Sequence, residues 1–301
     1  MNTEIIKGNV AAALKEDLGE EYSGGSDICS IDLTANLLPA GVIISADLIC
    51  RENAILCGKQ WFEEVFKQLD KNIAIIWEFS DGDPITKNCK VCRITGPARE
   101  VLTGERTALN FLQTLSGTAT NTRAYVDAIA GTDAVILDTR KTLPGLRDAQ
   151  KYAVRCGGGL NHRMGLYDAI LIKENHIYAS GSVQLALEQA KAIHTGKRGS
   201  KCQFIEIEVE SLDQLAQAIK AGATRIMLDN FSVEDIKIAV KTTSDAIELE
   251  ASGGINLDNI RSIATTGIDY ISVGDITKNL HATDFSLLIS PGVSVDVSTE
   301  D

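Results

Sequence analysis

The chain reads Val135-Ile136-Leu137-Asp138-Thr139-Arg140-Lys141 at the point where a short apolar run gives way to a basic loop. The segment that follows, residues 138–176, contains seven Lys or Arg residues and four Asp or Glu residues, a charge of +3, although the whole chain has a formal charge of −12. A local positive field in an acidic protein indicates a pocket for a small anion rather than a general nucleic-acid surface. The pattern of an apolar strand that ends in a polar side chain recurs further along the chain, and it predicts the fold.

Short β-branched runs alternate with amphipathic helical segments after residue 134. Strands are predicted at residues 135–137, 169–172, 204–209, 225–228, 247–250 and 270–273. Four positions close successive strands at intervals of 21, 23 and 22 residues: Glu208, Asp229, Ser252 and Gly274. This spacing is typical of a (β/α) barrel, in which the functional loops follow the carboxyl ends of the strands. Because six strands are fewer than the eight of a complete barrel, the sequence predicts an α/β protein with an incomplete, TIM-like barrel.

The first part of the chain has a different pattern and is predicted to form a separate sheet domain. It combines an amphipathic helix over residues 5–18, strand-like runs at 42–50, 54–57, 73–79 and 91–94, and a helix over 61–69. A long helix is predicted from about Thr107 to Ala130. Arg106 would then stand at or near its start, where the helix dipole favours anions.

Composition excludes several functional classes. Hydrophobic residues make up 44% of the chain and charged residues 23%, as in ordinary globular enzymes. No apolar run approaches the length of a membrane helix, and the first residues lack a signal-peptide pattern, so we expect a cytoplasmic protein. The acidic balance argues against nucleic acid or an anionic membrane as a partner. The seven cysteines are scattered and odd in number, which favours buried thiols over a metal or redox centre.

Side chains at the predicted strand ends fit phosphate and cation binding. Ser252-Gly253-Gly254 and Ser272-Val273-Gly274 follow the last two strands, where barrel loops commonly bind phosphate through backbone N–H groups. Glu208 and Asp229 end neighbouring strands and together could hold Mg²⁺ with substrate phosphates, bind ribose hydroxyls or stabilise developing positive charge. Capping of the following helices is the alternative for both acids.

The cations of the basic segment could act as a covalent nucleophile or as binding groups for anions. Lys173 ends a strand and is either a Schiff-base lysine, as in barrel aldolases, or a cation for a phosphate or leaving group. His162-Arg163 follows a triple glycine and, with Arg140, indicates carboxylate recognition, because a guanidinium group offers a planar fork.

Several runs resemble the quinolinate phosphoribosyltransferase family, also called nicotinate-nucleotide pyrophosphorylase (carboxylating). They are Leu137-Asp138-Thr139-Arg140-Lys141-Thr142-x-Pro144-Gly145, Asn161-His162-Arg163, Leu171-Ile172-Lys173-Glu174-Asn175-His176, Glu206-x-Glu208, Leu228-Asp229-Asn230-Phe231 and Gly104-Glu105-Arg106-x-Ala108-Leu109-Asn110-Phe111. The likeness extends over nearly the whole chain, from Glu16-Asp17-Leu18-Gly19 to Ile276-Thr277-Lys278.

The resemblance implies an N-terminal α/β sandwich domain, an open (β/α) barrel and an intertwined homodimer. The sandwich would comprise residues 1–116 plus about 276–290, the barrel residues 117–275, and residues 291–301 an acidic tail. The implied reaction converts quinolinate and phosphoribosyl pyrophosphate to nicotinate mononucleotide, pyrophosphate and CO₂ in NAD biosynthesis. It implies substrate-associated Mg²⁺ and no tightly bound organic cofactor.

The resemblance also assigns roles to matching positions. The quinolinate carboxylates would be held by Arg106, from the partner subunit, with Thr139, Arg140, His162 and Arg163. Phosphoribosyl pyrophosphate and its metal would be engaged by Lys141, Lys173, Glu208 and Asp229. The 5′-phosphate would be cradled by Ser252, Gly253, Gly254, Ser272 and Gly274.

Two features depart from the family pattern, and three rival functions stay open. The loop between Gly19 and Asp32 is long and acidic, and Asp275 replaces a small apolar residue next to the phosphate loop.

The three rival functions are a transferase for another ring acid without decarboxylation, a Schiff-base aldolase using Lys173, and a non-catalytic phosphate-binding barrel. The several cations argue against the first two, and the retention of Glu208, Asp229 and Lys173 together argues against the third.

Overall fold

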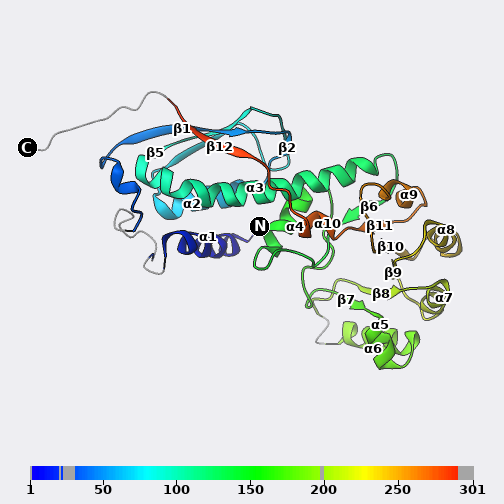
Figure 1. Ribbon diagram of the computed structural model, residues 1–301. Helices are drawn as coiled ribbons and strands as arrows, with labels where there is room; N and C mark the ends of the chain where they lie inside the picture. The colour runs from blue at the N-terminus through cyan, green and yellow to red at the C-terminus, as the bar shows by residue number, and fades with distance from the viewer. Residues whose placement is uncertain (1, 20–21, 23–30, 197–199, 291–301) are drawn as a thin grey trace, which may run out of the picture. The chain divides into compact units, whose positions relative to one another are not determined.

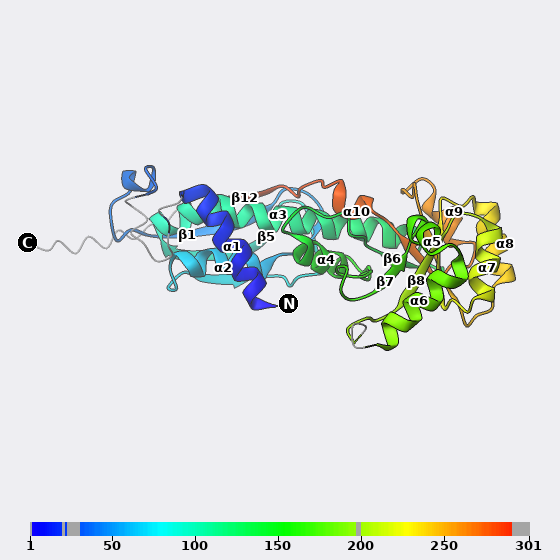
Figure 2. The same cartoon turned by 90° about the horizontal axis from the view of Figure 1, so that it is seen from below.

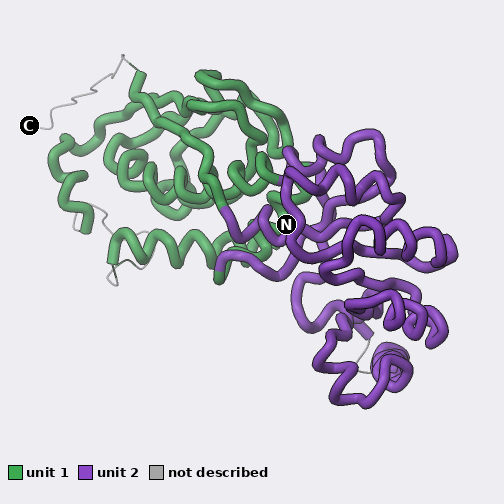
Figure 3. Tube along the Cα trace, turned by 45° about the vertical axis from the view of Figure 1, so that its right-hand side comes forward, with its two compact units in different colours: residues 1–121, 144–157, 280–301 green, residues 122–143, 158–279 purple. Residues whose placement is uncertain are grey.

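The computed structural model describes residues 2–19, 22, 31–196 and 200–290, so most of the acidic loop after Gly19 and all of the tail 291–301 lie outside the described residues. The chain forms two compact units (Figure 3). Unit 1 comprises Met1–Asn121, Pro144–Gly157 and Leu280–Asp301, and unit 2 comprises Thr122–Leu143 and Gly158–Asn279. Within the described ranges, no helix combines the length and the apolar character that a membrane crossing requires.

Unit 1 is an antiparallel sheet packed on helices, as predicted for the N-terminal α/β sandwich (Figure 1). Its sheet has the order β12-β1-β5-β3, and β2 pairs separately with β4. Strand β1 alternates between buried and more exposed positions, so one face of the sheet meets the core, where Trp61, Phe62 and Phe66 are fully buried. The elements are α1 (Thr3–Leu18), a 3₁₀ turn at Ala35–Leu37, β1 (Ile43–Cys50), β2 (Ala54–Ile55), α2 (Lys59–Leu69), β3 (Ala74–Trp77), β4 (Pro84–Ile85), β5 (Lys90–Pro97), α3 (Ala98–Ala128), α4 (Arg147–Cys156) and β12 (Phe285–Ile289). The last part of α3, residues 122–128, belongs to unit 2.

Helix α3 begins at Ala98, well before the predicted start at Thr107. Arg106 therefore lies inside the helix, and its predicted place at the positive end of the helix dipole is wrong. Gly104 does not break the helix. A Cβ at Gly104 would stand 2.7 Å from Leu69 Cδ1 and 2.9 Å from Phe66 Cε1, so glycine lets α3 approach α2 closely.

Helix α4 belongs to unit 1, although its sequence lies between two segments of unit 2 and within the predicted barrel range 117–275. Ala149 and Ala153 join the hydrophobic core of unit 1, which explains why the helix packs there. Lys151, one of its three cations, is also fully buried. The face Arg147-Lys151-Arg155 is therefore not a uniformly solvated helix surface.

Unit 2 contains all six predicted strands, and they form one parallel sheet of order β6-β11-β10-β9-β8-β7. Strands β6 and β7 stand at the two edges, so the prediction of an incomplete barrel is confirmed. Figures 1 and 2 show α6, α7 and α8 along the outer side of the strands. The elements are β6 (Val135–Leu137), β7 (Ile170–Ile172), α5 (Glu174–Ser180), α6 (Val183–Thr195), β8 (Ile205–Val209), α7 (Leu212–Lys220), β9 (Arg225–Asp229), α8 (Val233–Thr242), β10 (Glu248–Ser252), α9 (Ile260–Ala264), β11 (Tyr270–Ser272) and α10 (Asp275–Lys278).

A short irregular segment covers the free edge of β6. Leu160 forms a parallel bridge with Leu137, and its N–H donates to the Ile136 carbonyl at 2.8 Å. Unit 2 thus carries the segment that contains His162 and Arg163 directly on the edge of its sheet.

Candidate active site

A pocket of about 470 Å³ in unit 2 gathers most of the predicted site residues. The predicted residues that line it are Thr139, Arg140, Lys141, His162, Arg163, Lys173, Glu208, Asp229, Ser252, Gly253, Gly254 and Ser272. Sequence reasoning did not assign the other lining residues, which are Asp138, Leu171, Met227, Asn230 and Glu250. Gly274 adjoins the pocket through Lys141, while Arg106 is an exposed residue of α3 in unit 1.

The register of three neighbouring strands places acidic side chains in rows. Side chains two residues apart on a strand share a face, and residues paired between strands lie side by side. Glu208 and Glu250 both pair with Met227, and Asp229 pairs with Ser252 one row closer to the carboxyl ends. The alternation that fixes the sheet therefore also brings Glu208 and Asp229 to the same end of the pocket.

Lys173 and Glu208, which both line the pocket, form an ion pair. The distance from Lys173 Nζ to Glu208 Oε2 is 2.6 Å, and Glu208 is more buried than Lys173. Burial raises the pKa of the nearby Asp229 carboxyl, and the negative charge of Glu208 raises it further, whereas Lys173 and Lys141 lower it. The carboxylates of Glu208 and Asp229 are close enough to repel each other, so together they could bind an additional cation.

The buried carboxylate of Asp138 holds the cationic segment in place. It accepts hydrogen bonds from the His162 N–H at 3.0 Å and from Asn161 Nδ2 at 2.5 Å. Asp168 accepts from the N–H groups of Met164 and Gly165 at 2.7 and 3.0 Å, which fixes the turn after Arg163. These acids anchor the backbone on both sides of Arg163.

Arg163 presents a partly desolvated guanidinium group to the pocket. Burial lowers the pKa of Arg163, and the positive charge of Arg140 lowers it further. Two adjacent guanidinium groups repel each other, and a ligand with two negative charges would relieve this repulsion. The pair therefore fits a dicarboxylate better than a neutral ligand.

The two glycine loops differ in what they contact. Gly253 has a φ of +95°, and a Cβ there would stand 2.1 Å from Asn230 Oδ1. At Gly274 a Cβ would stand 3.1 Å from Lys141 Cδ, so this glycine leaves room for the lysine stem. Glycine at both positions leaves the backbone open to close approach by a phosphate.

Asp275, the residue that departs from the family pattern, is held by hydrogen bonds. It accepts from Tyr125 OH at 3.3 Å and from Asn279 Nδ2. Thr277 in the same short helix donates to the Lys141 carbonyl at 2.8 Å, which ties α10 to the basic loop.

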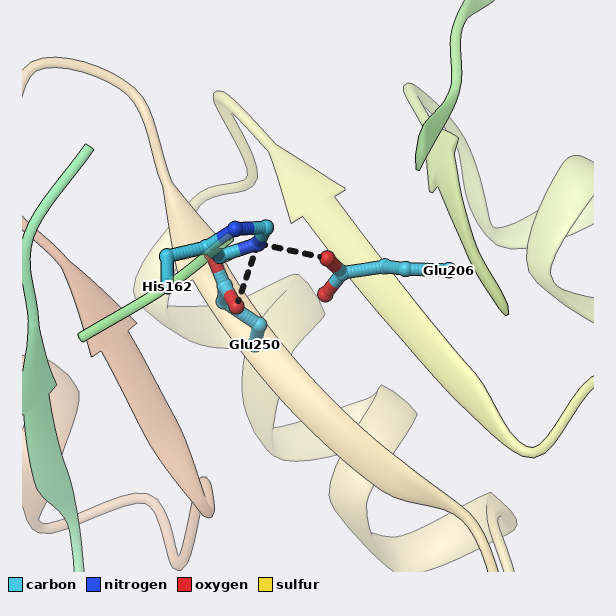
Figure 4. Close-up of side chains that lie close together, drawn as sticks. All are labelled: His162, Glu206 and Glu250. Carbon is cyan, nitrogen blue, oxygen red and sulfur yellow. Dashed lines mark hydrogen bonds and ion pairs between the residues drawn. The ribbon is translucent and has the colours of Figure 1, made fainter. Parts of the chain in front are cut away.

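A buried ionic cluster consists of Glu206, Arg225 and Glu250, and it adjoins the pocket because Glu250 is also a lining residue. Arg225 Nε donates to Glu206 Oε1 at 3.1 Å, and Arg225 Nη2 donates to Glu250 Oε2 at 2.9 Å. His162 Nε2 lies 2.7 Å from Glu206 Oε2 and 3.6 Å from Glu250 Oε2 (Figure 4). Burial raises the pKa of Glu250 to about 7, and the charge of Glu206 adds to this effect.

His162, Glu206 and Glu250 also have the spacing of a metal site. However, Arg225 already binds a carboxylate oxygen of both glutamates, so a metal ion would have to compete with a buried guanidinium group. Glu208 and Asp229 also line the pocket, and Glu208 pairs with a lysine rather than with a buried guanidinium group, so these two acids are the better oxygen ligands for a divalent cation.

Sequence reasoning missed the ionic cluster. Glu206 occurs in a quoted motif, but Arg225 opens a strand whose register with its neighbours is not visible in the sequence. The sequence offers one signal for Arg225. It stands two positions before the apolar Met227 and four before Asp229, so the alternation of a strand places its side chain on the same face as theirs.

Comparison with known proteins gives a consistent result. A family model described as "Quinolinate phosphoribosyl transferase, C-terminal domain" matches residues 118–288, and its N-terminal counterpart matches residues 32–116. A probable nicotinate-nucleotide pyrophosphorylase (carboxylating) of Bacillus subtilis is 41% identical, and the match covers 87% of this chain and 89% of the relative. The solved structure of the nicotinate-nucleotide pyrophosphorylase from Francisella tularensis has a TM-score of 0.89 at 46% identity, covering 96% of this chain and 98% of that one.

Proposed function

The chain belongs to the quinolinate phosphoribosyltransferase family, and on this premise we propose that it transfers a phosphoribosyl group from phosphoribosyl pyrophosphate to quinolinate with loss of CO₂. The products are nicotinate mononucleotide, pyrophosphate and CO₂, and the reaction serves NAD biosynthesis. The observation that carries the proposal is the pocket of unit 2, which combines Arg140, Lys141, Arg163 and Lys173 with the carboxylates of Glu208 and Asp229. Its cations match the anionic substrates, and its acids match a cationic transition state.

Arg140 and Arg163 hold the carboxylates of quinolinate, and Thr139 lies between Arg140 and the buried Asp138. Recognition by guanidinium groups orients the pyridine nitrogen toward the anomeric carbon of the ribose. Lys141 and Lys173 line the same pocket, close enough to Asp229 to lower its pKa, and they neutralise the pyrophosphate. The 5′-phosphate is bound by the backbone of Ser252, Gly253 and Gly254, together with Ser272 and Gly274.

The reaction needs no covalent intermediate with the protein. The pyridine nitrogen forms a bond to the anomeric carbon as the bond to pyrophosphate breaks, and positive charge develops on the sugar. In this proposal Glu208 and Asp229 stabilise this charge, and Lys173 stabilises the negative charge on the departing oxygen. All three residues line the pocket, which supports these roles. The ring nitrogen becomes cationic, so it stabilises the electron pair that stays on C2 when the C2–carboxylate bond breaks and CO₂ leaves, and this pair then binds a proton from solvent.

Glu208 and Asp229 would also hold Mg²⁺. Both supply hard oxygen ligands. Burial raises the pKa of Asp229 and the charge of Glu208 raises it further, and a divalent cation would offset both effects. When bound, Mg²⁺ supplies charge neutralisation of the pyrophosphate.

The Schiff-base alternative is less well supported. An imine-forming lysine must present an uncharged amine, whereas Lys173 is engaged with Glu208 through an ion pair of 2.6 Å.

Arg106 completes the quinolinate site from the partner subunit of a homodimer. Its side chain is exposed on α3, as a residue that acts on another subunit must be. Subunits carrying Arg106→Ala and subunits carrying Lys173→Ala are each inactive alone, and heterodimers regain activity because one of their two sites is intact. Verified heterodimers that stay inactive would refute the shared site.

The test of the reaction follows nicotinate mononucleotide and CO₂ together, with purified protein, quinolinate, phosphoribosyl pyrophosphate and Mg²⁺. We expect both products in equal amounts, and loss of both in Arg140→Ala and Lys173→Ala. Turnover of nicotinate but not quinolinate would assign the chain to a non-decarboxylating transferase.

A further inference from the structure

Both ring nitrogens of His162 are engaged by the protein itself. Nδ1 accepts a hydrogen bond from the backbone N–H of Arg163 at 2.7 Å, so Nδ1 carries no proton. Nε2 therefore carries the proton and donates it to Glu206 Oε2 at 2.7 Å. Figure 4 shows the imidazole ring directed at Glu206 and Glu250. A ring held in this way has no nitrogen left to donate to a substrate carboxylate.

The position of His162 depends in turn on Arg225. The guanidinium group of Arg225 bridges the carboxylates of Glu206 and Glu250, which come from β8 and β10 on either side of its own strand β9. Phe204 and Tyr270 each lie with their ring centroid 4.5 Å from Arg225 Cζ. Phe204 also packs edge-on against the ring of His162 at 5.4 Å between centroids. These contacts restrict the guanidinium group of Arg225 to a single orientation.

We propose that Arg225 is a positioning residue for the ring dicarboxylate: it fixes Glu206, which fixes the imidazole of His162, which fixes the backbone of Arg163 and thereby its guanidinium group. His162 then contributes to substrate binding through Arg163 and not through a direct contact of its ring nitrogens. The proposal rests on the proposed function, because the substrate whose binding it explains is the dicarboxylate of that reaction.

Only an arginine satisfies this arrangement. The two carboxylates lie on different strands, and a planar guanidinium group reaches both with separate nitrogen atoms. A lysine keeps the charge but loses the fork and the stacking on Phe204 and Tyr270. Arg225→Lys is therefore the informative substitution, since it separates geometry from charge.

The decisive experiment measures the KM of both substrates in Arg225→Lys. We expect the KM for quinolinate to rise about tenfold, because a small displacement of Arg163 weakens a bidentate contact, and the KM for phosphoribosyl pyrophosphate to stay within about twofold. Arg261→Lys is the matched control. Arg261 binds the carbonyls of Ala128 and Ala130, away from the pocket, and its loss should leave both KM values unchanged. If Arg225→Lys fails to fold, Phe204→Leu replaces it and should give a smaller shift in the same direction.

A double-mutant cycle tests the order of the chain of contacts. His162→Phe keeps a ring but removes both hydrogen bonds, and in that background Arg225→Lys should add little further loss. His162→Gln restores an acceptor for Arg163 and a donor for Glu206, so it should recover much of the affinity for quinolinate. Independent, multiplying effects of Arg225→Lys and His162→Phe, or equal rises in both KM values, would overturn the proposal.

The ring tautomer provides a readout that does not need turnover. Nitrogen-15 NMR of the four histidines should show His162 with its proton on Nε2 in the wild-type protein and a loss of this fixed state in Arg225→Lys. A wild-type protein without transferase activity would refute the proposed function while this spectrum still tested the role of Arg225. An unchanged His162 spectrum in Arg225→Lys would refute the inference while the function stood.

Discussion

The buried carboxyl group of Glu250 should make the stability of the protein depend on pH in an unusual direction. Its pKa rises from 4.5 to about 7, chiefly through burial and next through the charge of Glu206. Between these values the folded protein binds a proton at Glu250 that the unfolded chain does not bind. The free energy of unfolding therefore falls as pH rises through this window, and the loss is complete above the folded pKa. At about 1.4 kcal/mol per pKa unit, the loss is about 3 kcal/mol.

The substitution Glu250→Gln isolates this effect. Glutamine is neutral at every pH and keeps a donor and an acceptor, so it mimics the protonated acid. We expect the stability of the variant relative to the wild-type protein to increase by about 3 kcal/mol between about pH 4 and about pH 8. The measurement is urea-induced unfolding at several pH values, followed by circular dichroism. Trp61 and Trp77 both lie in unit 1, so tryptophan fluorescence would not report directly on this site.

A matched control is available on the same strand. Glu248 also faces Arg225, at 3.8 Å from Nη1, but its side chain is 51% exposed. Glu248→Gln removes a negative charge near the same guanidinium group without removing a buried carboxyl, so it controls for the loss of charge alone. A flat difference for Glu250→Gln over the same range would show that Glu250 does not titrate there, and the reasoning from burial would be wrong.

Three further outcomes can be measured with simple variants and additives. Gly253→Ala should raise the KM for phosphoribosyl pyrophosphate at least about tenfold, because its Cβ collides with Asn230, whereas Gly254→Ala, with no atom within 4 Å of the new Cβ, should cost only about 1 kcal/mol of backbone strain. Equal effects of the two substitutions would contradict the collision. Lys173→Met should lower kcat by about 10²–10³ with little change in the KM for quinolinate, as expected for a group that stabilises the leaving pyrophosphate, and an effect on KM alone would exclude that role. Removal of divalent cations with a chelator should abolish turnover, Mg²⁺ should restore it, and activity that persists in the chelator would remove the metal from the proposal.

The sequence was sufficient for the parallel sheet because its signals are local. Each strand is a short β-branched run, and the regular spacing from Glu208 to Gly274 follows from one strand and one helix per unit. The same regularity predicted which side chains meet, since the carboxyl ends of parallel strands share one edge. The pocket lining includes most of the predicted residues for this reason. Their individual roles stay predictions.

What the sequence did not provide depends on tertiary contacts. Helix α3 starts earlier than predicted and continues through Gly104, which is glycine because a Cβ there would collide with Leu69 and Phe66 on another helix. Likewise, Arg225 gains its importance from Glu206 and Glu250, which are paired to it only by the register of three strands. The position of α4 in unit 1 follows from packing that no local pattern encodes.

The bridge between Leu137 and Leu160 adds a short seventh segment to the edge of the open sheet, and local unfolding of this segment should affect the site. The amide of Leu160 is held by the edge of β6, and Arg163 lies only three residues further along the same segment. A fluctuation that separates this segment from the edge of β6 therefore also displaces the guanidinium group of Arg163, which is proposed to bind the substrate carboxylate. Occupancy of the pocket by a dicarboxylate must then slow hydrogen exchange at the Leu160 amide, so that a single backbone proton outside the pocket reports whether the site is assembled.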